Sequence, residues 1–272
     1  KANGKVVDSG LIDRIFVQPA ASDEGTALGA ALYPYLQLEQ KLPRIDFAHC
    51  YLGPEFNNEE IERTLKSYKL NYRNIGTERA RVIAAELAQG KIVGHFRGRM
   101  EFGPRALGNR SILADPRQAE MKDKVNMSVK YREWWRPFAP SMLEEHYHDY
   151  FAARALSPFM ILSFPVNAAK EAQIPAAVHV DQTARPQSVS KSTNPEYWEL
   201  INDFYDLAKK DITATRPWLA ASFDDIVNNR VIIDQDDALK LGLVDTIARY
   251  DELEKIYKFI VPCNGIYKTE LR

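Results

Sequence analysis

Hydrophobic positions along this 272-residue chain alternate between helix-like and strand-like spacing. Apolar residues three and four apart, together with capping residues, predict helices over 26–33, 58–68, 77–90, 118–129, 194–205, 236–241 and 251–260. Short apolar runs predict strands over 14–17, 91–96, 111–114, 158–166, 185–190, 218–223, 230–233 and 243–248. Strands that alternate with helices in this way predict an α/β fold.

Two of the helices have clear sequence signals at their ends. Asn194 is a favourable N-cap residue, and Pro195 after it suits the first helical position. Thr77 is the expected N-cap of the earlier helix, which should end at Gly90. The stretch 42–57 contains two prolines and a glycine and is expected to be a connector.

The strand over 91–96 leads into a segment, 97–117, that is rich in arginine, glycine and proline. Its arginines are Arg97, Arg99, Arg105, Arg110 and Arg117. A guanidinium group offers a planar fork of donors to phosphate or carboxylate oxygens, and glycine lets the backbone approach a ligand. For any single arginine, a solvated basic loop is the simpler interpretation. Several arginines in one constrained loop favour an anion-binding site.

Positive charge is concentrated in this part of the chain. Between Lys91 and Pro140 there are 11 lysines and arginines against 5 aspartates and glutamates, a balance of +6 in a chain of net charge −1. Lys130, Arg132 and Arg136 form a second basic group, which is either a basic helix end favoured by the helix dipole or a phosphate site. Such a concentration of charge attracts anionic ligands.

Composition limits the compartment and the partners. Hydrophobic residues make up 45% of the chain and charged residues 27%, and no run approaches the roughly 18 apolar residues that a membrane helix needs. Cys50 and Cys263 lack metal-type spacing and indicate a reducing compartment. We therefore expect a cytoplasmic protein that binds neither membrane nor nucleic acid. Because it begins with Lys1 rather than Met, we expect it to be part of a longer protein.

A longer pattern joins the two basic groups. The residues E-F-G-P-R-A-L-G-N-R-S-I-L-A-D-P-R of 101–117, followed by N-x3-K-x-R-x3-R-P-F-A-P-S at 126–141, resemble the carboxy-terminal region of the NodU/antibiotic O-carbamoyltransferase family. The resemblance implies that residues 43–272 form a YrdC-like domain, a twisted mixed sheet with flanking helices. Residues 1–42 resemble the end of the family's transfer domain, which is of the actin–hexokinase–Hsp70 type.

The resemblance also assigns roles to single residues. Arg105, Lys130 and Arg136 match positions that contact phosphate, and these are the residues expected to act in catalysis. Arg185 matches a position near the nucleotide, and Arg132, which lies between Lys130 and Arg136, is a further candidate for binding it.

Asp23 matches a metal-ligating aspartate of the transfer domain, within V-Q-P-A-A-S-D-E-G-T-A-L-G-A-A. The histidines that complete this site lie upstream in the family. A single carboxylate is a poor transition-metal site. Fe²⁺ or another divalent metal is therefore expected only where that domain is present.

The pattern departs from the family at 219–224. The family reads L-N-T-S-F-N there, and its serine and second asparagine contact the nucleotide. This chain keeps Ser222 but has Ala220, Ala221 and Asp224. An aspartate that faces a triphosphate repels it unless Mg²⁺ lies between them. The alternative to an active enzyme is therefore a catalytically impaired nucleotide- or anion-binding module, or a structural one, that acts with a separate transfer subunit.

The implied reaction joins carbamoyl phosphate and ATP, with Mg²⁺, into carbamoyl-adenylate. A carbamate oxygen attacks the α-phosphate of ATP and pyrophosphate leaves, while the cationic side chains stabilise the developing charge. No side chain in the pattern resembles a nucleophile, so catalysis would rest on positioning and electrostatics. The carbamoyl group would pass to a hydroxyl-bearing small molecule that the sequence does not identify. The sequence leaves open whether the protein forms a homodimer.

Two other groups indicate structure rather than chemistry. His146 and His148 lie among acidic residues but lack the further ligands of a zinc site. Trp134 and Trp135 are expected in the core rather than as a platform for a base.

Overall fold

The computed structural model describes residues 1–13, 15–42 and 47–215. The chain divides into two units, Lys1–Asp211 and Ile212–Arg272, and all described residues except 212–215 belong to the first. The strands and helices predicted beyond residue 216 lie outside the described residues, as do Ser222 and Asp224. The expected domain boundary at 42–43 stays a prediction.

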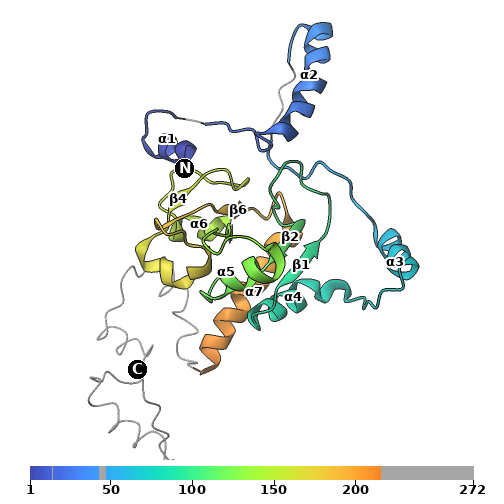
Figure 1. The fold of residues 1–272 in the computed structure, drawn as a ribbon, viewed down its shortest axis with the longest axis vertical. Helices are drawn as coiled ribbons and strands as arrows, with labels where there is room; N and C mark the ends of the chain where they lie inside the picture. Colours follow the sequence, from blue (N-terminus) through green and yellow to red (C-terminus); the bar gives the residue numbers. More distant parts are fainter. Residues whose placement is uncertain (14, 43–46, 216–272) are drawn as a thin grey trace, which may run out of the picture. The chain divides into compact units, whose positions relative to one another are not determined.

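The N-terminal region contains α1 (Ala2–Asp8), η1 (Asp23–Gly25) and α2 (Thr26–Glu39) (Figure 1). The predicted helix starting at Thr26 is confirmed and is longer than expected, because the chain continues through Pro34 to a left-handed cap at Gln40. The strand predicted over 14–17 is wrong for its described residues, 15–17, which form no strand. Their apolar side chains have no paired strand beside them.

The next two helices, α3 (Asn58–Ser67) and α4 (Arg79–Ala88), were both predicted. Asn57 begins α3 with a capping box, since its side chain accepts from the Glu60 N–H while the Glu60 side chain accepts from the Asn57 N–H. The cap predicted for α4 is wrong, because a 3-10 turn, η2 (Gly76–Glu78), leads into it and no side chain caps it. Gly90 lies just beyond the end of α4, with φ of 73°, as a C-terminal glycine should.

Two antiparallel strands follow, β1 (Val93–Phe96) and β2 (Arg110–Leu113), with Phe96 opposite Arg110 (Figure 1). β1 lies within the predicted range 91–96, and β2 begins and ends one residue before the predicted range 111–114. Residues 97–109 connect them, and we call this connection the arginine loop. The Arg97 N–H donates to the Asn109 carbonyl at 2.9 Å, so the loop is closed at its base. It is therefore the connection of a hairpin rather than a link to a crossover helix.

The elements between β2 and the last helix are short. They are α5 (Met121–Val125), the π-helical turn η3 (Asn126–Lys130), β3 (Ser141–Leu143), η4 (Glu144–His146), α6 (Tyr147–Tyr150), β4 (Phe164–Pro165), η5 (Ala168–Gln173), η6 (Pro175–Ala177), β5 (Thr183–Ala184) and β6 (Gln187–Val189). The helix expected over 118–129 thus starts at Met121 and widens at its end. The strand predicted over 158–166 is wrong except for β4, because Met160 adopts a left-handed φ of 53° that a strand does not accommodate.

Strand pairing within the described residues produces three two-stranded sheets. β1 pairs with β2 and β4 with β5, both antiparallel, whereas β3 pairs with β6 in parallel. The mixture of helices with parallel and antiparallel strands confirms the α/β class.

The long helix α7 (Pro195–Thr215) begins where the Asn–Pro signal predicted. The Asn194 side chain accepts a hydrogen bond from the Tyr197 N–H at 3.1 Å and so caps the helix. A buried cluster joins α7 to α4 and β6, and its members are Ala80, Ala84, Val189, Tyr197 and Leu200. A second cluster surrounds β4, β5 and α6 and includes Tyr147, Phe151 and Phe164. These two clusters support the segments that carry the arginine loop and Arg185.

The structure also tests the expected burial of two tryptophans and the expected lack of a membrane helix. Trp134 and Trp135 are 66% and 50% exposed, so their expected place in the core is wrong. They lie in the irregular segment after η3, where no described helix or sheet covers them. Among the described residues, no helix is both long enough and apolar enough to span a membrane.

Candidate functional site

Four of the five arginines in 97–117 are bound to other parts of the protein. Arg97 pairs with Glu196, Arg99 donates to the carbonyl groups of Leu52 and Gly53, Arg110 pairs with Glu101, and Arg117 pairs with Asp115. Arg105 differs, because no described residue accepts a hydrogen bond from it or forms an ion pair with it. The anion site expected from all five arginines therefore narrows to Arg105.

The pair at the base of the loop is bidentate. Arg97 donates to the two carboxylate oxygens of Glu196 at 2.8 and 3.0 Å. This hydrogen bonding raises the pKa of Arg97 and lowers that of Glu196. Both groups stay charged at neutral pH, and their pairing joins the arginine loop to the first turn of α7.

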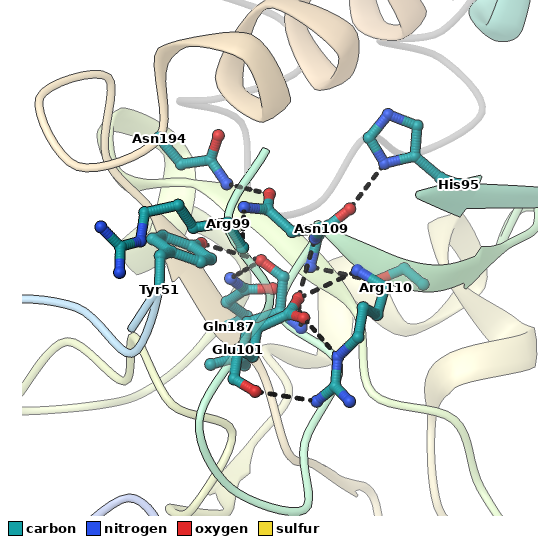
Figure 2. A network of polar contacts seen from close by, with 11 residues as sticks. Tyr51, His95, Arg99, Glu101, Asn109, Arg110, Gln187 and Asn194 are labelled. Carbon is teal, nitrogen blue, oxygen red and sulfur yellow. Dashed lines mark hydrogen bonds and ion pairs between the residues drawn. The ribbon is translucent and has the colours of Figure 1, made fainter. Parts of the chain in front are cut away.

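Glu101 is at the centre of the loop's hydrogen bonds (Figure 2). Its side chain has no exposed surface. One carboxylate oxygen, Oε1, accepts from the backbone N–H groups of Leu107, Asn109 and Arg110 at 2.7, 2.8 and 3.2 Å. The other, Oε2, accepts from Arg110 Nε at 3.0 Å. A buried carboxylate is tolerated only when it is paired and hydrogen-bonded, and here both conditions are met.

The carbonyl group of Leu107 connects the loop to two other segments. It accepts hydrogen bonds from the Tyr51 hydroxyl and from Gln187 Nε2, each at 2.9 Å. Burial raises the pKa of Tyr51 to about 12, so the hydroxyl keeps its proton and donates. Gln187 lies in β6, two residues after Arg185. This contact therefore fixes the segment between β5 and β6, which carries Arg185, against the loop that carries Arg105.

Asn109 connects the loop to α7. Its side-chain amide donates to the Arg99 carbonyl at 2.7 Å, and its side-chain oxygen accepts from Asn194 Nδ2 at 2.9 Å. Asn194 is also the cap of α7, so one side chain serves the helix and the loop together (Figure 2). On the other side, His95 Nδ1–H donates to the Gly108 carbonyl at 2.6 Å. Burial lowers the pKa of His95, so this imidazole is neutral at pH 7.

Two glycines allow close approaches that a side chain would prevent. Gly103 has φ of 107°, and a Cβ there would lie 3.3 Å from the Cβ of Ala20. Gly108 has φ of 115°, and a Cβ there would lie 2.6 Å from Cγ of the Tyr197 ring. These contacts hold the loop between α7 and the segment that precedes η1. The stretch that precedes Asp23 and the arginine loop are thus in contact.

Arg105 belongs to a group of arginines that we call the cationic cluster: Arg105, Arg132, Arg136 and Arg185. Burial lowers the pKa of Arg185, and the charges of Arg105 and Arg132 lower it further. Burial also lowers the pKa of Arg132, with an added effect from Arg136. The Nε of Arg185 is buried and has no hydrogen-bond partner among the described residues. The cluster therefore holds mutually repelling cations and an unsatisfied donor, which an anion would stabilise.

The segment after η3 holds two members of the cluster in place. Arg132 donates from Nε to the Asn126 side-chain oxygen at 2.7 Å and lies over the Phe138 ring. Arg136 forms an exposed ion pair with Glu133 at 2.9 Å. Asn126 is completely buried and also donates to the Arg136 carbonyl. Arg132 is thus fixed by the fold, whereas Arg136 has a partner that is readily exchanged.

Lys130 and Asp23 are both exposed. Lys130 ends the π-helical turn, and Tyr131 after it has φ of 47°, so the chain reverses before Arg132. Among the described residues, no hydrogen bond or ion pair joins Lys130 to the cationic cluster. Around Asp23, no group of three His, Cys, Asp or Glu side chains forms within the described residues. A lone carboxylate does not suit a transition metal, so no chemical step is assigned to Asp23.

The sequence analysis did not identify the acidic residues that pair with Arg97 and Arg110 and so make them unavailable to a ligand. Glu101 precedes Arg110 by nine residues and Glu196 follows Arg97 by 99. Nothing in a local pattern shows that Glu196 reaches Arg97, because only the fold brings α7 to the loop. Glu101 could have been found from its place within the arginine-rich pattern, as one of two acids among its cations.

The fold and the site define a mixed α/β protein in which a hairpin loop and the connection between β5 and β6 bring arginines together. A family model described as carbamoyltransferase C-terminus matches residues 84–242. The match spans more than half of the chain, and the chain belongs to this family. The resemblance in the arginine-rich pattern is thereby confirmed.

Several curated proteins are similar to this chain. Nodulation protein NolO of Bradyrhizobium diazoefficiens is 49% identical over 209 residues, which cover 74% of this chain and 38% of that protein. Nodulation protein NolNO of Sinorhizobium fredii is 46% identical over 210 residues, covering 74% and 30%. Nodulation protein U of Rhizobium tropici is 34% identical over 207 residues, covering 76% and 34%. The chain thus spans about a third of the length of these relatives.

Proposed function

We propose that this chain is the part of a carbamoyltransferase that binds ATP and carbamoyl phosphate and joins them into carbamoyl-adenylate. The observation that supports it most directly is the cationic cluster, with the buried and unpartnered Nε of Arg185. Four guanidinium groups suit a ligand with several phosphate oxygens. A YrdC-like fold for 43–272 and a remnant of an actin–hexokinase–Hsp70-type domain for 1–42 belong to the same proposal.

In this proposal, Arg105 and Arg185 bind phosphate oxygens. Arg132 and Arg136 neutralise further phosphate charge, and Lys130 adds a point charge. Hydrolysis of carbamoyl phosphate yields carbamate and inorganic phosphate. A carbamate oxygen then bonds to the α-phosphorus, and the bond to the β-phosphate oxygen breaks to release pyrophosphate. The side chains hold the reactants and stabilise charge on the α-phosphate oxygens.

Mg²⁺ is expected to arrive with ATP, because it is usually held by phosphates and by few protein ligands. The described part of the cluster consists of cations, so it does not itself provide a magnesium site. The transfer step to a hydroxyl-bearing small molecule is assigned to a domain of the actin–hexokinase–Hsp70 type.

The test is titration of ATP with Mg²⁺ and, separately, of pyrophosphate, followed by calorimetry. Arg105→Ala and Arg185→Ala should each weaken binding about tenfold or more, since a charge-assisted hydrogen bond is lost. Arg81→Ala is the matched control, because Arg81 is an exposed arginine of α4 that pairs with Glu78. Equal affinity in wild type and both cluster variants would refute the site.

A second candidate function is supported by the departures at Ala220, Ala221 and Asp224. On that view the chain binds nucleotide but forms carbamoyl-adenylate slowly or not at all. Pyrophosphate release with ATP and carbamoyl phosphate distinguishes the two candidates. The triple variant Ala220→Asn, Ala221→Thr and Asp224→Asn should raise the rate, most of all through Asp224→Asn, which removes a negative charge. Brisk release by wild type, with no gain in the triple variant, would exclude this second candidate.

A further inference from the structure

Glu101 is a fully buried carboxylate whose bonding partners all belong to the turn that carries Arg105 or to its base (Figure 2). We propose that Glu101 is a positioning residue: it closes the turn from 101 to 107 and thereby fixes Arg105 within the cationic cluster. The effect on ligand binding rests on the proposed function. The effect on the loop does not.

The turn is closed by one short hydrogen bond. Leu107 N–H donates to Glu101 Oε1 at 2.7 Å, so the residues between them, including Arg105, form a loop tied at both ends. The Leu107 carbonyl is held from outside by Tyr51 and Gln187. Leu107, two residues after Arg105, is therefore held through its N–H by Glu101 and through its carbonyl by Tyr51 and Gln187. This restricts the conformations that the backbone at Arg105 can adopt.

Glu101 also determines which arginine is left for a ligand. It pairs with Arg110 through Oε2, and the Arg110 guanidinium donates in addition to the Glu101 carbonyl at 3.0 Å. The charge of Arg110, the first residue of β2, is thus neutralised by Glu101 of the loop. Without this pairing the guanidinium of Arg110 would compete with Arg105 for anions or for space in the loop.

A carboxylate suits this place better than an amide of the same size. Glu101 accepts at both oxygens, with three N–H groups at Oε1 and Arg110 at Oε2. Glutamine keeps one accepting oxygen, but its NH2 group would face either Arg110 or the backbone N–H groups. Glu101→Gln should therefore keep the shape of the side chain while it loosens the loop.

The first experiment measures hydrogen exchange of the backbone amides of Leu107, Asn109 and Arg110, without any ligand. In Glu101→Gln these amides should exchange at least about tenfold faster, because their acceptor is weakened. Asp115→Asn is the matched control, since Asp115 is another buried carboxylate, 1% exposed, that pairs with an arginine, Arg117. The control should leave the three amides unchanged. Unchanged exchange in Glu101→Gln, or equal acceleration in the control, overturns the proposal.

The second experiment is a double-mutant cycle on the affinity for ATP with Mg²⁺. Glu101→Gln should weaken binding about three- to tenfold when Arg105 is present and less than twofold in the Arg105→Ala background. Equal weakening in both backgrounds would mean that Glu101 acts on the fold as a whole, and it would overturn the positioning role. If wild type binds neither ATP nor pyrophosphate, the proposed function fails, and the exchange experiment alone decides whether Glu101 holds the loop.

Discussion

Residues 97–117 and the segment after η3 are both basic, yet their arginines have different kinds of partner. In 97–117, Arg97, Arg110 and Arg117 are paired with acids that are partly or fully buried. After η3, Arg136 pairs with an exposed acid, Glu133, and Arg132 binds a neutral amide. The richer of the two segments in arginine therefore offers a ligand a single arginine, Arg105. The number of arginines in a motif is a poor guide to anion binding, because most of these arginines serve the fold.

The largest expected effect is on stability, at Glu101. Glu101→Ala should lower the free energy of unfolding by about 3–5 kcal/mol, because Arg110 and three backbone N–H groups lose a buried acceptor. Urea denaturation measures this change. Glu133→Ala, which removes an exposed carboxylate from the other basic segment, should cost about 1 kcal/mol or less. Similar costs for the two variants would remove the contrast between the segments.

The next effect separates Arg105 from its neighbour in the sequence pattern. Arg105→Ala should weaken ATP binding by about 1.5–3 kcal/mol and leave the free energy of unfolding unchanged within about 0.5 kcal/mol. Arg110→Ala should do the reverse and destabilise the protein, since Glu101 would be left buried and unpaired. Calorimetry and urea denaturation on the same samples test both. Loss of stability in Arg105→Ala would show that Arg105 also serves the fold.

A smaller effect is expected where the ion pair is exposed. The side chains of Arg136 and Glu133 are 49% and 52% exposed. Glu133→Gln should release Arg136 and tighten ATP binding by about two- to fivefold, corresponding to about 1 kcal/mol or less. The gain should disappear in the Arg136→Ala background. Tighter binding that persists there would mean that Glu133 repels the ligand directly.

The smallest effect concerns pH and His95, which supports the loop at Gly108. Burial lowers the pKa of His95 below its ordinary value of 6.5, so the native protein binds this proton less readily than the unfolded chain does. Stability should therefore be fully present above pH 6.5 and fall as the pH decreases toward the lowered pKa. Urea denaturation between about pH 5 and 7.5 should show a steeper acid loss in wild type than in His95→Gln. Parallel curves would contradict this expectation.

Elements with strong local signals were predictable from the sequence, and the site was predictable in part. Asn194 and Pro195 located the start of α7, and the arginine-rich pattern located the loop. β3 was missed because three residues contain too little periodicity. The neighbourhood of Arg105 and Arg185 depends on the contact between Gln187 and Leu107, which are 80 residues apart. Such a contact follows from packing of the whole fold, and no local pattern contains it.

Because Gly108 lies so close to Tyr197, we expect position 197 to tolerate substitution and position 108 not to tolerate it. The aromatic ring occupies the space that any side chain at 108 would need, so an enlarged residue there requires a smaller one at 197. Shrinking Tyr197 is not enough, however, because the φ of 115° at Gly108 disfavours every residue with a Cβ. In a library that varies both positions, we expect smaller residues at 197 to survive beside glycine. Replacements at 108 should vanish whatever stands at 197.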